Sequence, residues 1–313
     1  MEKQNERNEN YVYCNIKELI ELNGQYQTVV DELKKSKRTR LEKYITPIKQ
    51  RNLKKLIKEI KYRNYARKNF SLEGNCSEVI AYDKKIGNIN KRIAVYSCIT
   101  GGYDHVIEPL TKEANIDYFM FTDQKVPKTS IWKKIDVTKF SEYETLAPKD
   151  LNRRIKMIPY DYLKEYDYSV YVDGNIEIIY GIKNIIRNLK NASLAIHYHP
   201  VRDCIYDEGV AVVHHKKADP IQVKNQLEQY RKDGFPRHYG MTENSIIVRK
   251  HENKETEKLM RLWWDEYQKY PTRDQFTLSY LMWKTNYSKM NFISLGNNLE
   301  KNPYFNRIQK HLL

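Results

Sequence analysis

The stretch YSVYVDGNIEIIY, residues 168–180, is apolar and β-branched up to Val172, breaks at Asp173, Gly174 and Asn175, and then becomes apolar again. A short β-branched run that ends in turn residues predicts a buried strand. Asp173 and Asn175 would place two oxygen-bearing side chains on one tight turn, and Mg²⁺ and Mn²⁺ bind such oxygen ligands. The same three residues also make an ordinary turn between strands, so both interpretations remain open.

Similar apolar runs recur on both sides of this strand. They predict further strands at 92–100, 117–123, 192–199, 209–215 and 244–250. Between them, residues 181–190 and 220–234 have helical periodicity. Strands that alternate with helices predict an α/β fold with a largely parallel sheet.

Composition excludes some classes of protein. Hydrophobic residues make up 40% of the 313 residues and aromatic residues 12%, which excludes a disordered chain. The net charge of +15 favours a polyanionic neighbour, such as nucleic acid, an anionic membrane or a phosphate-bearing substrate. The four cysteines form no CxxC pair, and neither an apolar leader nor a run of ~20 apolar residues is visible. We therefore expect a cytoplasmic protein.

The N-terminal part of the chain differs from the rest, which predicts a basic helical extension at 1–90 and a main domain at 91–313. Residues 49–68 carry nine basic residues and one acid, with Leu53, Leu56, Ile57 and Ile60 at helical spacing. This helix either packs its apolar stripe on the main domain or contacts an anionic membrane surface from the cytoplasmic side.

The ends of the predicted strands are the places to look for a ligand site, since α/β sheets bind ligands at the carboxyl edge. Neither GxGxxG nor GxxxxGK[ST] occurs in the sequence. The first strand ends in TGGYD, where Thr100, Gly101 and Gly102 let a ligand approach the backbone and Tyr103 offers a stacking surface. The second ends at Asp123, an acceptor suited to a ribose hydroxyl or a base N–H. We interpret these residues as a nucleoside site.

Two later motifs concentrate titratable groups. HYHPVRDCIYDE at 197–208 contains His199, Arg202 and Glu208, which are suited to acid–base chemistry and to binding sugar hydroxyls. The RDQ motif places Asp274 and Gln275 at the start of a helix. Asp274 is either an N-cap or first-turn acid of this helix or a contact to the sugar.

Five segments, VYSCITGGYD, YFMFTD, NRRIKMIPYDYLKEYDYSVYVDGNIEI, HPVRDCIYDE and WWDEYQKYPTRDQFTLSY, resemble the motifs of a glycosyltransferase-like family found in bacteria and plants, of the TOD/MUCI type. The resemblance covers about 91–300 and implies a GT-A type fold. It also implies that Asp173 and Gly174 bind the donor and that Asp173 and Asn175 hold Mn²⁺ or Mg²⁺. Asn175 stands where the usual motif has a carboxylate, so the metal would be held weakly or partly replaced by basic residues of NRRIK, namely Arg153, Arg154 and Lys156.

These observations predict a glycosyltransferase that moves a sugar from a nucleotide-diphospho-sugar, of which a UDP-sugar is the expected form, to a glycan or lipid-linked glycan. Asp274, Gln275 and Glu208 are the predicted catalytic residues, and His199 and Arg202 are predicted to bind the acceptor. One alternative is a glycoside hydrolase in which Asp207 or Glu208 faces Asp274. Another is a basic polyanion-binding protein, although no base-stacking motif supports nucleic acid as the partner.

Overall fold

The computed structural model describes residues 53–69, 90–296 and 298–308. The chain divides into two compact units, Met1–Lys68 and Asn69–Leu313. In the first unit, the described part is helix α3, Leu53–Asn69, which confirms a helix in the predicted basic segment from residue 53 onward. The remainder of the predicted extension, 1–52 and 70–89, lies outside the described residues.

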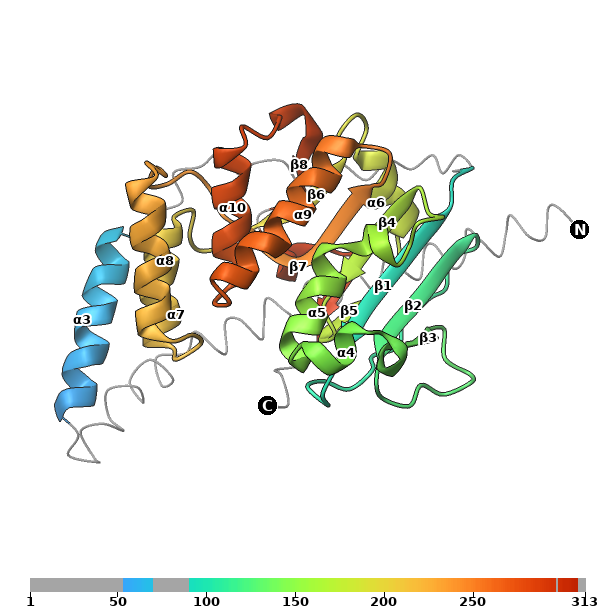
Figure 1. The fold of residues 1–313 in the computed structure, drawn as a ribbon, viewed down its shortest axis with the longest axis horizontal. Helices are drawn as coiled ribbons and strands as arrows, with labels where there is room; N and C mark the ends of the chain where they lie inside the picture. Colours follow the sequence, from blue (N-terminus) through green and yellow to red (C-terminus); the bar gives the residue numbers. More distant parts are fainter. Residues whose placement is uncertain (1–52, 70–89, 297, 309–313) are drawn as a thin grey trace, which may run out of the picture. The chain divides into compact units, whose positions relative to one another are not determined.

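The second unit is built on a seven-stranded sheet with the order β3-β2-β1-β4-β7-β6-β8 (Figure 1). Strand β7 pairs antiparallel with β4 and β6, and the other neighbouring strands pair in parallel. A separate antiparallel pair joins β5 to β9. The strands are β1 Ile93–Ile99, β2 Ile116–Thr122, β3 Lys133–Asp136, β4 Tyr168–Val172, β5 Ile176–Ile178, β6 Leu194–Tyr198, β7 Thr242–Lys250, β8 Phe292–Ser294 and β9 Phe305–Arg307. The predicted α/β fold with a largely parallel sheet is confirmed.

Apolar side chains cover both faces of this sheet. Along β1, Ala94 and Tyr96 join one hydrophobic cluster while Ile93 and Val95 join the other, because successive side chains of a strand point to opposite faces. The first cluster packs against α5, α7, α8, α9 and α10, and the second against α6. The helices of this unit are α4 Glu142–Thr145, α5 Pro148–Met157, α6 Ile182–Asn188, α7 Ile205–His214, α8 Pro220–Lys232, α9 Lys254–Lys269 and α10 Asp274–Lys284, with 3₁₀ turns at Val137–Lys139, Pro159–Asp161, Lys289–Asn291 and Leu299–Lys301. Burial on both sides explains why the central strands β1 and β4 are almost entirely apolar.

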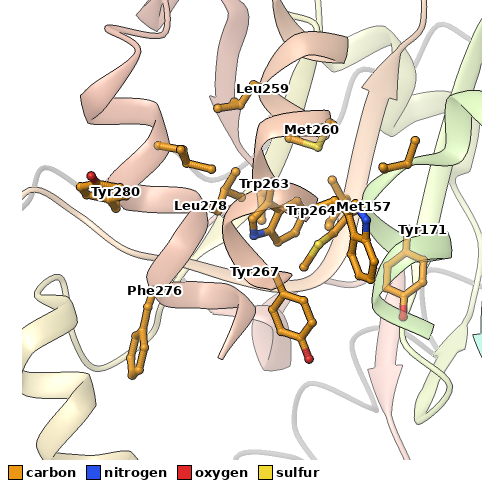
Figure 2. Packing of buried hydrophobic residues seen from close by; sticks show 14 of the residues in the cluster. Met157, Tyr171, Leu259, Met260, Trp263, Trp264, Tyr267, Phe276, Leu278 and Tyr280 are labelled. Carbon is orange, nitrogen blue, oxygen red and sulfur yellow. The ribbon is translucent and has the colours of Figure 1, made fainter. Parts of the chain in front are cut away.

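The largest buried side chains lie where α9 meets α10 and the sheet (Figure 2). Leu259, Trp263 and Tyr267 of α9 are buried there, and the Trp263 indole donates a hydrogen bond of 3.0 Å to the carbonyl oxygen of Asp274. The aromatic stripe of α9 is therefore core, as its helical spacing indicates, and it fixes the first turn of α10.

One predicted strand is wrong. Residues 209–215 belong to helix α7, because Gly209 allows α7 to lie directly on α8, where an added Cβ would come within 2.3 Å of the Leu227 side chain. The run of valines has the composition of a strand, but packing on a neighbouring helix overrides that weak preference.

Arg249 of β7 is a fully buried cation. Its guanidinium donates hydrogen bonds to the Tyr96 hydroxyl (3.1 Å), the Lys156 carbonyl (2.8 Å) and the Met260 sulfur (3.1 Å). The Tyr96 hydroxyl donates to the same Lys156 carbonyl at 3.0 Å. Arg249 thereby ties β7 to β1, to α9 and to the C-terminal turn of α5.

Candidate functional site

A cavity of about 910 Å³ opens where β1 and β4 end and β7 begins. The antiparallel direction of β7 brings its first residues to the edge where its parallel neighbours finish. The first turn of α10 and one face of α5 complete the walls. Most of the predicted site residues line this cavity: Thr100, Gly101, Tyr103, Lys156, Asp173, Gly174, His199, Arg202, Glu208, Asp274 and Gln275.

The loop after β1 is held by side chains on either side of it. The Thr100 hydroxyl donates to the Pro148 carbonyl at 2.7 Å, and the Gly101 amide donates to Asp123 Oδ2 at 2.8 Å. Gly101 has φ +65°, and a Cβ there would lie 2.8 Å from Pro148 Cβ, so the loop requires glycine at this position. Tyr103, which follows, remains 43% exposed at the cavity.

The turn after β4 shows why Asp173, Gly174 and Asn175 interrupt the apolar run. A Cβ on Gly174 would lie 2.8 Å from Ile99 Cγ1 and 3.3 Å from Asp104 Oδ2, so glycine lets the turn pack on the end of β1. Asn175 is buried behind the turn. Of the two predicted metal ligands, Asp173 lines the cavity and Asn175 does not.

A lysine joins the two central carboxylates. Lys156 has a side chain only 2% exposed, and its Nζ lies 3.4 Å from Asp173 Oδ1 and 2.8 Å from Asp274 Oδ2. The Tyr171 hydroxyl donates to the same Asp173 oxygen at 2.8 Å. Burial and the negative charge of Asp173 raise the pKa of Tyr171 well above its usual value, so this hydroxyl keeps its proton.

Asp274 is a buried anion and not a helix cap. The N-cap position of α10 is Arg273, which forms no side-chain cap hydrogen bond, and Asp274 is the first helical residue. Burial alone would raise the pKa of the Asp274 carboxyl, but the charges of Lys156, Arg153 and Arg273 hold it well below its usual value. Asp274 therefore stays ionised at neutral pH.

His199, Arg202 and Glu208 form a second network in the same cavity. The Arg202 guanidinium Nε donates to Glu208 Oε2, and the backbone amides of Val201 and Arg202 donate to His199 Nδ1 at 3.3 and 3.0 Å. Burial and the charge of Arg202 lower the pKa of His199 to about 3. His199 is thus neutral at pH 7.

Four predicted residues are not brought to the cavity wall: Gly102, Asp123, Arg154 and Asn175. Arg154 lies on another side of α5, where its guanidinium pairs with Glu142 (3.1 Å) and Asp161 (3.2 Å). The prediction of Arg154 as a donor ligand has no support in this arrangement. Asp123 holds the Gly101 amide, so it shapes the loop and does not face the cavity.

Other cavity residues did not stand out in the sequence. On α5, Lys149 and Asn152 line the cavity beside the predicted Arg153 and Lys156, and the spacing i, i+3, i+4 and i+7 of these four polar residues is the signal that could have found the first two. Cavity residues in strand β7 and near the C-terminus had no comparable signal, and these are Glu243, Asn244, Ser245, Asn298, Glu300 and Arg307. Lys216 and Lys217 were not named either, and Asp104 ends the TGGYD motif but was given no role.

The residues present do not form a good site for a divalent cation at this turn. Asp173 offers one carboxylate, and one of its oxygens already accepts from Tyr171 and Lys156. Mg²⁺ is commonly held by one or two carboxylates together with phosphate oxygens of the substrate, and here the single carboxylate is already shared with the Lys156 ammonium. Among the described residues, the one group of three metal-ligating side chains within 4.8 Å is Cys204, Asp207 and His238, which are not among the cavity residues.

The position of the cavity places this protein among the α/β enzymes that bind a ligand at the carboxyl edge of a mixed sheet. The chain belongs to the family of TOD1/MUCI70 glycosyltransferase-like domains, whose model matches residues 63–310. The protein is therefore a glycosyltransferase, and the predicted family and enzyme class are confirmed. The match begins at residue 63, nearer to the N-terminus than the motifs alone indicated.

Solved glycosyltransferase structures are similar to this chain. Mouse xyloside xylosyltransferase 1, in its apo form, matches with a TM-score of 0.37 and 10% identity over 64% of this chain and 84% of its own. The apo structure of the bifunctional glycosyltransferase WbbM matches with a TM-score of 0.40 and 15% identity over 69% of this chain and 41% of its own. A comparison of the sequence with curated proteins gave no match.

Proposed function

We propose that this glycosyltransferase takes its sugar from a UDP-sugar and transfers it to a glycan, free or lipid-linked. The observation that supports this proposal best is the cavity at the ends of β1 and β4, which combines an exposed aromatic ring at Tyr103 with basic residues of α5 and with Arg273, the residue before α10. A flat ring suits a nucleobase, and fixed cations suit a diphosphate. The family establishes a glycosyltransferase, and the polar and aromatic lining of the cavity supports a nucleotide-diphospho-sugar as the donor.

In this proposal the two networks of the cavity have separate roles. Asp274 and Gln275 bind the hydroxyls of the donor sugar, while His199 and Arg202 bind the acceptor. Glu208 is bonded to the Arg202 guanidinium and positions it. During transfer the bond between the anomeric carbon and the diphosphate breaks, a bond from the anomeric carbon to an acceptor oxygen forms, and the proton of that hydroxyl passes to the departing diphosphate, which leaves as UDP. Binding of Mn²⁺ or Mg²⁺ stays a prediction. The side-chain oxygens available at Asp173 do not favour it.

The carboxylates that the glycoside hydrolase alternative requires form ion pairs with basic side chains. Asp207 is buried and pairs with Arg237 at 2.6 Å, Glu208 accepts from Arg202, and Asp274 pairs with Lys156. A glycosidase needs one carboxyl that can give up a proton, whereas Asp274 is held ionised by its neighbours. This arrangement favours transfer from an activated donor.

The donor class can be tested by thermal unfolding of the full chain. We expect UDP-sugars to raise Tm more than GDP-, CMP- or dTDP-sugars at equal concentration, because a ligand at about 100 times its Kd adds roughly 2.7 kcal/mol to the free energy of unfolding. Differential scanning fluorimetry with each donor measures the shift. A larger shift with another nucleotide would reject UDP, and no shift with any of them would reject the donor class.

We also propose that the protein acts in the cytoplasm, in contact with anionic lipid through residues 49–68. No helix in the described parts of the chain is both long and apolar enough to cross a bilayer. In α3, Lys54, Lys58 and Lys61 are exposed, and Ile57 and Ile60 expose 52% and 41% of their surface. Basic and apolar side chains together favour binding at a membrane surface.

Reversing the charge of this helix tests the membrane contact. Replacing Lys54, Lys55, Lys58 and Lys61 by glutamate should abolish sedimentation with anionic vesicles at low salt, since each lysine near the surface contributes about 1 kcal/mol. Hydrolysis of the free donor should be unchanged. Neutral vesicles are the control, and wild-type protein that stays in the supernatant with anionic vesicles would contradict the proposal.

A further inference from the structure

We propose that fixed cationic side chains of the cavity bind the donor diphosphate without a divalent cation. The inference rests on the proposed use of a nucleotide-diphospho-sugar. The positive charge that Mn²⁺ or Mg²⁺ would otherwise bring to the diphosphate then comes from four side chains, those of Lys149, Arg153, Lys156 and Arg273.

The first argument is the place that Lys156 occupies. Its ammonium lies between the carboxylates of Asp173 and Asp274, within 3.4 and 2.8 Å of them. A cation bound at Asp173 would have to displace this lysine or share one carboxylate with it. Lys156 is buried on helix α5, and Arg249 and Tyr96 hold its backbone carbonyl, so the ammonium is a built part of the site.

The second argument is the charge that remains after the cavity's ion pairs are matched. Glu208 pairs with Arg202, Arg307 pairs with both Glu243 and Glu300, and Lys156 pairs with Asp173 and Asp274. Arg153 lies 4.0 Å from Asp274 Oδ2. Within the described residues, four further cavity cations form no ion pair of 4.0 Å or less, namely Lys149, Lys216, Lys217 and Arg273. The Lys149 ammonium donates to the neutral Pro271 carbonyl, and the Arg273 guanidinium donates to the neutral Gln275 amide.

The third argument is that these cations lie close to one another. Burial and the charges of Arg153 and Arg273 lower the pKa of Lys149. The same two arginines act on Tyr103, the predicted platform for the base. Like charges held together at the wall of a cavity are costly in the empty protein and are relieved by a polyanion. A diphosphate beside Tyr103 meets this requirement.

Calorimetric titration of the full chain with UDP tests the inference. We expect the Kd for UDP to differ by less than about threefold between excess EDTA and millimolar Mn²⁺ or Mg²⁺, because the protein supplies the cations itself. The Lys149→Met/Arg273→Gln double variant should weaken UDP binding by about 10- to 100-fold in EDTA, as expected from losing charge-assisted hydrogen bonds. It should leave uridine binding unchanged.

Arg154→Gln is the matched control, since Arg154 is on the same helix as Arg153 but pairs with Glu142 and Asp161. Its affinity for UDP should equal that of the wild type. UDP binding that appears only with Mn²⁺ or Mg²⁺ would overturn the inference and leave the proposed donor intact. If neither UDP nor another nucleoside diphosphate binds with or without a cation, the proposed donor fails and the inference with it.

Discussion

The Asp274→Asn variant is expected to lose about 10- to 100-fold in kcat/KM for sugar transfer while remaining folded. A hydrogen bond to a charged group contributes roughly 1.5–3 kcal/mol, and about 1.4 kcal/mol corresponds to a factor of ten. The amide keeps the size of the side chain but cannot accept two hydroxyl protons from the sugar as the carboxylate does. Because Arg273 is the N-cap, no capping bond is lost.

The structural role of Asp274 has to be separated from its role in transfer. Removing one partner of a buried pair costs roughly 3–5 kcal/mol, whereas replacing both partners by apolar groups is often nearly neutral. Lys156→Met/Asp274→Leu should therefore be more stable than either single variant and still inactive. Asp265→Asn, an exposed position on α9, is the control for the chemical change. Full activity of Asp274→Asn would show that Asp274 only supports the fold.

The second large effect is expected for Asp173→Asn, which should reduce transfer by at least about tenfold with little change in Tm. The Asp173 side chain is 24% exposed at a strand end, and asparagine can still accept from Tyr171, so the fold loses little. Transfer falls because the carboxylate that orients the Lys156 ammonium becomes neutral. Transfer rates and melting temperatures of the two proteins check this.

The affinity of the Asp173→Asn variant for UDP, measured in EDTA, distinguishes binding by cationic side chains from binding by a metal ion. It should stay close to that of the wild type if cationic side chains hold the diphosphate, and it should be lost if Asp173 binds a metal that does so. Asp167→Asn is the control, because Asp167 precedes β4 and lies at its other end, where it accepts from the Arg92 amide at 2.8 Å. A variant at position 173 with unchanged turnover would remove Asp173 from the site.

The sequence predicted those parts of the fold that local pattern determines. The ends of β1 and β4 were recognised because each apolar run stops at turn residues, and these ends do line the cavity. Residues 209–215 were misassigned because a run of valines fits a buried strand as well as a packed helix. Nothing local indicates that α7 lies on α8, since that depends on residues far along the chain.

Site residues could be predicted from the sequence where they follow a strand or share one face of a helix. They could not be predicted where their position depends on how distant strands pair. Lys156 was named with Arg154, although a helix separates their directions by about 200° and only Lys156 shares a face with Arg153. Glu243 could not be found, because it begins a strand whose antiparallel direction is set by pairing with β4 and β6. The rule that ligands bind at the carboxyl ends of strands does not identify a residue near the start of an antiparallel strand.

The buried Arg249 has a consequence for how sequences of this kind can change. Arg249 does not line the cavity, yet its guanidinium holds the carbonyl of Lys156, the residue whose ammonium lies between the two central carboxylates. A substitution at position 249 would be selected against even where the hydrophobic core tolerated it. Buried residues such as Arg249, which support the cavity residues without contacting a ligand, should therefore also be under evolutionary constraint in this enzyme.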